Sequence, residues 1–418
     1  MTRSSRKSGE GRFSLCGAPC SFTLVLCSLL TLSTSGLLAQ SSEHERIEPP
    51  NTATPSRAQV DRAIALAAGY LERACGPDGK FVYEVDTFSG RKSNLYDIIR
   101  HAGAMYALAM FNQQHPDRQA ADTLVRAARF MLRNYVGPGV RPGQLAVWSK
   151  PVSSNRQPTN QYAELGGAGL GLVALAATRQ IDPKSVSLDQ LQALGRFLLF
   201  LQREDGSFVH KYDAKSGSAP NWHSLYYPGE AALGLVALYE ADGSSQWLDA
   251  ATKTLVYLAK SRVGLSTVPS DHWALIATVK LLHYCDAGAC PSARDELIQH
   301  ALQVCNSILH EQFRGSAAVG LDGAFDPDGR TTPAATRLEG LLSALEFLPK
   351  GDLRERIVTA IEHGIGFLLR TQIVSGPNSG GMPGAILLRA GNASEIRIDY
   401  VQHSLCALLR YRLLSLQR

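Results

Sequence analysis

The sequence lacks clustered positive charge. Its formal net charge is only +5 over 418 residues, and no basic run is interleaved with aromatic residues. Part of that charge belongs to the first twelve residues, so the rest of the chain is close to neutral. Surfaces that bind nucleic acid use clustered lysine and arginine to neutralise phosphates. We therefore expect no nucleic-acid partner.

A long, clean hydrophobic run is also missing. The most apolar stretch, residues 22–38, is interrupted by serine and threonine, whereas a membrane-spanning helix needs about 20 apolar residues. A basic lead-in, this stretch and the small residue Ala39 predict a signal peptide over 1–39 and a flexible linker over 40–56. The protein is thus expected to be exported, either periplasmic or secreted. The alternative is a leader retained as an anchor, which is the only membrane contact expected.

Cysteine is scarce, with five of the eight cysteines lying beyond the leader. Cys285 and Cys290 flank a short turn, and an oxidising compartment favours a local disulfide between them. Zinc binding is the alternative, but it needs a second Cys/His pair at ligand spacing, and none stands nearby. We therefore predict a structural disulfide, and we assign no metal ligands and no cofactor.

What the sequence does contain is internal repetition. The stretch Asp78-Gly-Lys-Phe recurs as Asp205-Gly-Ser-Phe, and each copy is followed at a similar distance by an apolar helical run. Weaker copies start near residues 321 and 380, and two more divergent units carry residues 161–177 and 271–284. Six copies with a period of about 60 residues indicate a repeat architecture.

Each repeat contains two helices of different character. The first is amphipathic with charges on one side, and Ser56 and Ser187 stand as N-caps for two of these helices. The second, as in residues 166–175, is small and apolar nearly all round, which is typical of a buried helix. This pattern predicts an all-α fold in which inner and outer helices alternate. We expect an (α/α)6 toroid of six helical hairpins with short β-turn segments between the helices, forming one domain over 57–418.

The turn of the repeat resembles that of a known superfamily. Gln202 followed by Asp205-Gly-Ser-Phe resembles the Gln-x-x-Asp-Gly-x-aromatic turn of α/α-toroid proteins such as the terpenoid cyclases. The chain beyond the leader is also similar to the (α/α)6 barrels of many carbohydrate-active enzymes. The resemblance implies an architecture, and a fold alone does not define a function.

The cyclase chemistries find no support in the residues. Terpenoid cyclases use aspartate-rich motifs, and two consecutive aspartates occur nowhere in this chain. The prenyltransferase and lanthionine-cyclase branches hold zinc with Cys and His at the cavity, and no such pair is found there. Neither activity is expected.

Alignment of the repeats predicts which side chains meet at the mouth of the toroid. The predicted catalytic residues are acids and imidazoles near the starts of inner helices: Glu230, Asp271, His272, Glu339, Asp399 and His403. The predicted substrate-binding residues are Arg100, His101, Tyr226, Tyr227, Trp273, Arg337, Arg397 and Gln402. A purely structural reading explains acids at helix N-termini, which the helix dipole favours by about 0.3–1 kcal/mol. It does not explain arginines there, so a functional cavity is favoured.

These residue types suit chemistry on a saccharide. Two carboxylates facing each other across a cavity can cleave a glycosidic bond, and arginine binds the carboxylate of an acidic sugar. A histidine or tyrosine could instead remove the proton next to that carboxylate, giving elimination or epimerisation. The prediction is an exported enzyme acting on an extracytoplasmic, acidic saccharide, with hydrolase, lyase and epimerase left open. The alternative is a non-catalytic toroid that binds a glycan, peptide or lipid.

Overall fold

The computed structural model describes residues 54–150, 161–219, 221–288, 290–315 and 320–414. The predicted leader and nearly all of the predicted linker lie outside these ranges. The described chain forms twelve α-helices in two alternating sets. The outer set is α1 (Arg57–Ala74), α3 (Arg118–Asn134), α5 (Leu188–Leu201), α7 (Ser245–Ser261), α9 (Arg294–Glu311) and α11 (Asp352–Thr371). The inner set is α2 (Ile98–Gln114), α4 (Leu165–Ile181), α6 (Tyr227–Asp242), α8 (His272–Asp286), α10 (Thr331–Ala344) and α12 (Ile398–Leu414).

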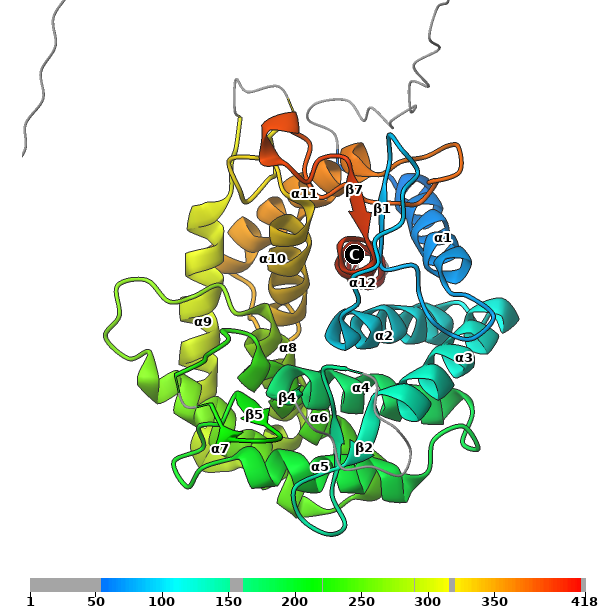
Figure 1. The fold of residues 1–418 in the computed structure, drawn as a ribbon. Coiled ribbons are helices and arrows are strands. Elements are labelled where there is room, and N and C mark those ends of the chain that lie inside the picture. The colour runs from blue at the N-terminus through cyan, green and yellow to red at the C-terminus, as the bar shows by residue number, and fades with distance from the viewer. Residues whose placement is uncertain (1–53, 151–160, 220, 289, 316–319, 415–418) are drawn as a thin grey trace, which may run out of the picture. The chain divides into compact units, whose positions relative to one another are not determined.

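The inner helices form a closed ring. Each packs against the next, from α2 through α4, α6, α8 and α10 to α12, and α12 returns to α2. The outer helices lie around this ring, each against two inner neighbours, and Figure 1 shows α1, α3, α5, α7 and α9 at the periphery. The six-hairpin toroid predicted from the repeats is confirmed.

Small residues set the spacing of the inner ring, as the contact between α4 and α6 shows. A Cβ atom added at Gly169 would collide with the backbone of Ala231, and one added at Gly234 would collide with the carbonyl of Gly169. The all-round apolar character of these helices follows from burial on every side.

The predicted starts of two outer helices are confirmed. Ser56 accepts a hydrogen bond from the backbone N–H of Gln59, and the Gln59 side chain accepts one from the backbone of Ser56. Ser187 and Gln190 form the same reciprocal pair at the start of α5. These capping boxes satisfy backbone donors that would otherwise have no partner in the helix.

The repeated turn docks each unit onto the next outer helix. Gln202, which ends α5, donates its side-chain amide to the carbonyl of Ala250 in α7 at 2.8 Å. Gly206 in the same turn has a positive φ of 90°, and a Cβ atom there would overlap the carbonyl of Lys253. Gln312 and Gln372 make the corresponding bonds to the next outer helices. The motif is therefore the joint between successive hairpins.

Short strands and two 3-10 turns complete the described chain. The strands are β1 (Glu84–Asp86), β2 (Val136–Pro138), β3 (Leu145–Val147), β4 (Tyr162–Glu164), β5 (Lys211–Asp213), β6 (Gly217–Ser218) and β7 (Glu395–Arg397), and the 3-10 turns are η1 (Pro291–Ala293) and η2 (Leu388–Ala390). Strands β1 and β7 pair antiparallel with Glu84 opposite Arg397, which joins the first repeat to the last just before α12.

Two further observations bear on the sequence predictions. Cys285 and Cys290 form a disulfide, as expected. No helix in the described part of the chain is both long and apolar enough to cross a membrane.

Candidate active site

A cavity of about 390 Å³ opens at the N-terminal ends of the inner helices. All six inner helices contribute to its lining, from Arg100 of α2 and Leu170 of α4 to His403 of α12. Most of the predicted site residues lie here: Arg100, Tyr226, Tyr227, Glu230, His272, Trp273, Arg337, Arg397, Asp399, Gln402 and His403. As the repeat alignment predicted, the fold brings together residues that lie up to about 300 positions apart in the sequence. His101, Asp271 and Glu339 do not line the cavity.

His101 was predicted at the mouth, and this placement is wrong. Its ring is fully buried, with Nε2 donating to the carbonyl of Ala127 at 3.0 Å and Nδ1 accepting from the hydroxyl of Tyr96 at 2.7 Å. Burial lowers its pKa to about 4, so the ring is neutral. His101 follows Arg100 in α2, and successive side chains of an α-helix differ in direction by about 100°. The side chain of His101 therefore points away from the cavity and toward α3.

Asp271 was predicted to be catalytic, but it does not reach the cavity. Its carboxylate accepts the backbone N–H of Ala274 at 3.0 Å and pairs with Arg262 at 2.9 Å, and both side chains are buried. Arg262 also contacts His300 at 3.0 Å. Asp271 thus begins α8 and anchors it to the segment before it, which is a structural task.

Glu339 was expected at the mouth but lies beneath it. The repeat alignment placed it in a first turn, whereas α10 begins at Thr331 and makes Glu339 its ninth residue. The side chain is fully buried. It nevertheless touches the cavity lining, because Nδ1 of His403 donates to its Oε1 at 2.6 Å. Glu339 is therefore positioned to orient His403 and not to meet a ligand from the rim.

His272 lies against this pair. Its ring centroid is 5.4 Å from that of His403, in an edge-on arrangement. The side chain is only 1% exposed, and neither ring nitrogen has a hydrogen-bond partner among the described residues. Burial, together with the charge of His403 and nearby arginines, lowers its pKa well below the ordinary value, so the imidazole is neutral. His272, Glu339 and His403 are also the residues here that could hold a metal ion.

Glu230 occupies the first turn of α6, as predicted. Its carboxyl group is buried, and Oε2 has no partner within the described chain. Gly166 of α4 makes room for it, because a Cβ atom there would collide with this oxygen. Burial raises the pKa of Glu230 to about 8, with smaller contributions from the charges of Asp271 and Asp97. The group is therefore protonated at neutral pH and can donate a hydrogen bond.

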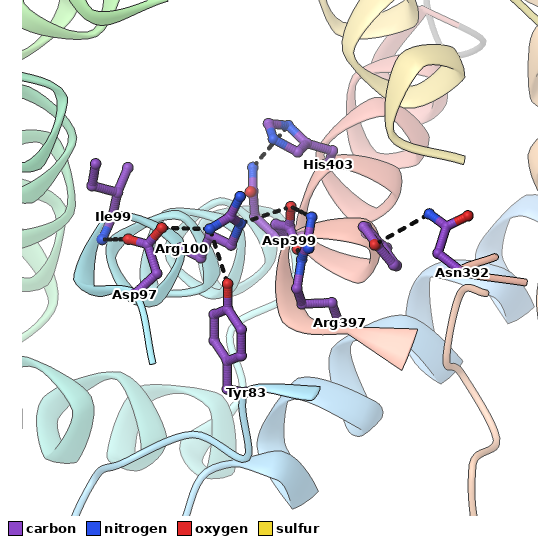
Figure 2. A network of polar contacts seen from close by, with 10 residues as sticks. Tyr83, Asp97, Ile99, Arg100, Asn392, Arg397, Asp399 and His403 are labelled. Atoms are coloured by element: carbon purple, nitrogen blue, oxygen red, sulfur yellow. Dashed lines mark hydrogen bonds and ion pairs between the residues drawn. The ribbon is translucent and has the colours of Figure 1, made fainter. Parts of the chain in front are cut away.

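The opposite side of the cavity is an ionic network (Figure 2). Asp399 accepts two hydrogen bonds from Arg397, at 2.6 and 3.0 Å, and one from Arg100 at 3.1 Å. Arg100 also contacts Asp97 and donates to the hydroxyl of Tyr83 at 2.9 Å. Burial acts to raise the pKa of Asp399, but Arg397 and Arg100 outweigh it and lower the pKa. This carboxylate is held ionised by two cations.

Aromatic side chains edge the cavity. Tyr226 packs edge-on against His272 with centroids 5.1 Å apart, and Tyr227 lies 5.3 Å from Trp222. Trp273, behind them, contacts Tyr106. Such faces suit a sugar ring, although the same contacts also pack neighbouring repeats together.

Several lining residues were not anticipated from the sequence. Asp97 could have been found, because it caps α2 by accepting the backbone N–H of Ile99, much as Asp271 caps α8. Arg330, Asn392 and Tyr400 also line the cavity. Asn392 lies between α11 and α12, outside the repeated pattern, so no signal in the sequence pointed to it.

No family model and no curated protein sequence matches this chain. Several solved structures are similar to it. A cellobiose 2-epimerase from Bacillus thermoamylovorans superimposes with a TM-score of 0.64 at 11% identity, covering 85% of this chain and 99% of that one. A sugar epimerase from a ruminal bacterium gives 0.62 at 12% identity, covering 85% and 98%. An unsaturated glucuronyl hydrolase specific for heparin gives 0.59 at 12%, covering 86% and 98%.

At this identity the likenesses establish the fold alone. The chain is an (α/α)6 toroid, with its cavity at the N-terminal ends of the inner helices. The predicted fold class is confirmed, and no specific enzyme family is matched.

Proposed function

We propose that this protein is an enzyme that acts on a saccharide by proton transfer, with His403 as the base. The observation that carries this proposal is the pairing of His403 with buried Glu339 at the floor of the cavity. Because a carboxylate can only accept, we assign the ring hydrogen to Nδ1, which leaves Nε2 as the basic nitrogen; the amide nitrogen of Gln402, 3.1 Å from the same Nδ1, is then a contact and not a hydrogen-bond donor to it. A buried carboxylate behind an imidazole fixes the tautomer and stabilises the imidazolium formed when the ring accepts a proton.

Glu230 supplies a complementary acid in the same cavity. A base can remove a proton from the carbon next to a sugar carbonyl only if charge on the carbonyl oxygen is stabilised. Glu230 is protonated at neutral pH and can donate a hydrogen bond to that oxygen. Return of the proton to the same carbon from the opposite face gives an epimer. Its return to the former carbonyl carbon, with the hydroxyl proton of the first carbon lost and the former carbonyl oxygen protonated, gives an isomer. The epimerases among the similar folds support this reaction class.

Glycoside hydrolysis is the second candidate, favoured by the same unusual carboxyl group. A hydrolase needs a protonated acid and an ionised carboxylate. Glu230 fits the acid, and Asp97 lines the cavity as the carboxylate. A glycoside hydrolase family 76 α-mannanase from Bacteroides thetaiotaomicron, with a TM-score of 0.57, shares the fold.

An acidic substrate is the finer part of the proposal. It is supported by the arginines of the cavity: Arg100, Arg330, Arg337 and Arg397. Each of them has a carboxylate partner, as Arg337 has in Glu311 at 2.8 Å. A guanidinium has five N–H donors, so a bound uronate can share one of these arginines with its present partner. We also propose that the protein is located outside the cytoplasm. The leader sequence and the disulfide support this location, and measuring the mass of the protein in separated cell fractions would test it.

Deuterium exchange separates the candidates. The protein would be incubated in D₂O with neutral and uronic disaccharides, and the products would be followed by NMR. Proton transfer predicts deuterium at the carbon next to the carbonyl and a new epimer or isomer, both lost in His403→Ala and Glu230→Gln. New reducing ends without deuterium would indicate hydrolysis instead. Binding without any product would favour the non-catalytic alternative.

A further inference from the structure

One part of the cavity floor has more unpartnered polar atoms than proton transfer requires. Both ring nitrogens of His272 and the Oε2 atom of Glu339 are buried, and none has a hydrogen-bond partner among the described residues. Buried polar atoms nearly always have partners, since leaving one without costs about 1–3 kcal/mol. Three such atoms on two adjacent side chains indicate that a ligand completes them.

The arrangement of these side chains identifies the class of ligand. One potential ligand atom each from His272, Glu339 and His403 lie within 4.8 Å of one another. Two imidazoles and one carboxylate are a common ligand set for a transition metal that keeps an open position. We propose that these three side chains bind a divalent transition-metal ion, with Zn²⁺ as the preferred occupant and its open position toward the cavity.

The chemistry of the site favours zinc over magnesium or calcium. Mg²⁺ and Ca²⁺ prefer oxygen ligands, whereas two of the three side chains here are histidines. Zinc binds imidazole and carboxylate ligands together. The positive charges of Arg337 and Arg410 act on His272 and impose an electrostatic penalty on any bound cation. Arg337 is neutralised by Glu311 at 2.8 Å, so part of this penalty is removed.

The site goes beyond the proposed function and makes a prediction about it. A metal ion on Glu339 and His403 withdraws this pair from proton transfer. Zinc is therefore expected to inhibit the proposed activity, and a chelator is expected to restore it. Metal binding and catalysis can be measured separately, so the two proposals can fail independently.

The test is direct titration of untagged, chelator-treated protein with ZnCl₂ by calorimetry, with MgCl₂ as the comparison. We expect one zinc site per chain and no magnesium binding. His272→Phe keeps the ring volume and removes both ligand nitrogens, so it should weaken zinc binding at least tenfold. Because these nitrogens have no hydrogen-bond partner among the described residues, His272→Phe should unfold at no lower temperature than the wild type. His283→Ala, on an exposed histidine, is the matched control and should bind zinc unchanged.

Three results would decide the matter. Absence of zinc binding in the wild type overturns the site. Equal zinc binding by the wild type and by folded His272→Phe also overturns it. Should zinc bind at the triad and raise the activity, the metal site stands and the role of His403 as a base fails.

Discussion

The two sides of the cavity satisfy their buried polar groups in opposite ways. On the side of α2 and α12, Arg100, Arg397 and Asp399 hold one another in a network of charged hydrogen bonds (Figure 2). On the side of α8 and α10, His272 and Glu339 have buried atoms with no hydrogen-bond partner in the part of the chain that the structure describes. A completed network makes the structure rigid, whereas an incomplete one is costly unless a ligand completes it. The side of α2 and α12 thus holds the ring of inner helices closed, whereas the side of α8 and α10, which we call the open side, has polar atoms available to a ligand.

The position of each side in the ring explains the difference. The ionic side lies where the last repeat meets the first, beside the pairing of β1 with β7. No covalent hairpin turn joins α12 to α2, so this contact depends on non-covalent interactions: the pairing of β1 with β7 and the side-chain network. The opposite side lies within the continuous run of hairpins, where the chain already fixes the neighbours and side chains can be left unsatisfied.

The largest effect is expected at His403, which extends from α12 to Glu339 on the open side. His403→Asn, which keeps a hydrogen-bond donor for buried Glu339, should lower kcat/KM by about 10²–10⁴-fold, the usual contribution of a general base, with little change in the unfolding temperature. Steady-state kinetics and thermal unfolding measure the two quantities, with His283→Ala as the control. Retained activity would remove the functional distinction between the two sides.

On the ionic side, substitution should affect stability. Asp399→Asn leaves Arg100 and Arg397 without their shared carboxylate, and loss of one partner of a buried pair costs about 3 kcal/mol, less where the guanidinium groups reach solvent. Arg118→Ala, which removes an exposed pair with Asp122, should change the free energy of unfolding by at most about 1 kcal/mol. Denaturant unfolding compares the two variants, and equal losses would contradict the structural role of the network.

Glu230 predicts a pH dependence with a definite sign. Its pKa rises from 4.5 in the unfolded chain to about 8 in the folded protein. The folded state therefore binds the proton more tightly, and the contribution of this group to stability falls as the pH rises from about 4.5 to about 8. Glu230→Gln should match the wild type at pH 5 and exceed it at pH 8.5. Unfolding curves at both pH values check this, and parallel curves would show that the carboxyl is not held neutral.

The smallest effect is expected from Arg337. If an acidic sugar binds here, Arg337→Ala should raise its KM about tenfold, since a hydrogen bond to a charged group contributes about 1.5–3 kcal/mol. The KM of a neutral sugar should remain unchanged. Equal changes in KM for both sugars would show that Arg337 does not discriminate between acidic and neutral substrates.

The architecture follows from the pattern of residues along the chain. The alternation of amphipathic and all-round apolar helices predicts an outer and an inner ring, because burial on every side removes the polar face. Residue types at short spacing predict other features, such as the N-caps at Ser56 and Ser187 and the disulfide between Cys285 and Cys290. Each of these depends on residues a few positions apart. The repeats also placed most of the cavity residues, because equivalent positions in a ring face the same centre.

The roles of individual side chains depend on how the helices pack in three dimensions. A helix rotates about 100° per residue, so an error of one position sends His101 into the core while Arg100 enters the cavity. An earlier start of α10 carries Glu339 below the mouth, where it meets His403. The pairing of Asp271 with Arg262, and the absence of hydrogen-bond partners for His272 among the described residues, depend on how neighbouring helices pack. Period and composition specify which helices are buried, but the start and rotation of each helix decide which atoms meet.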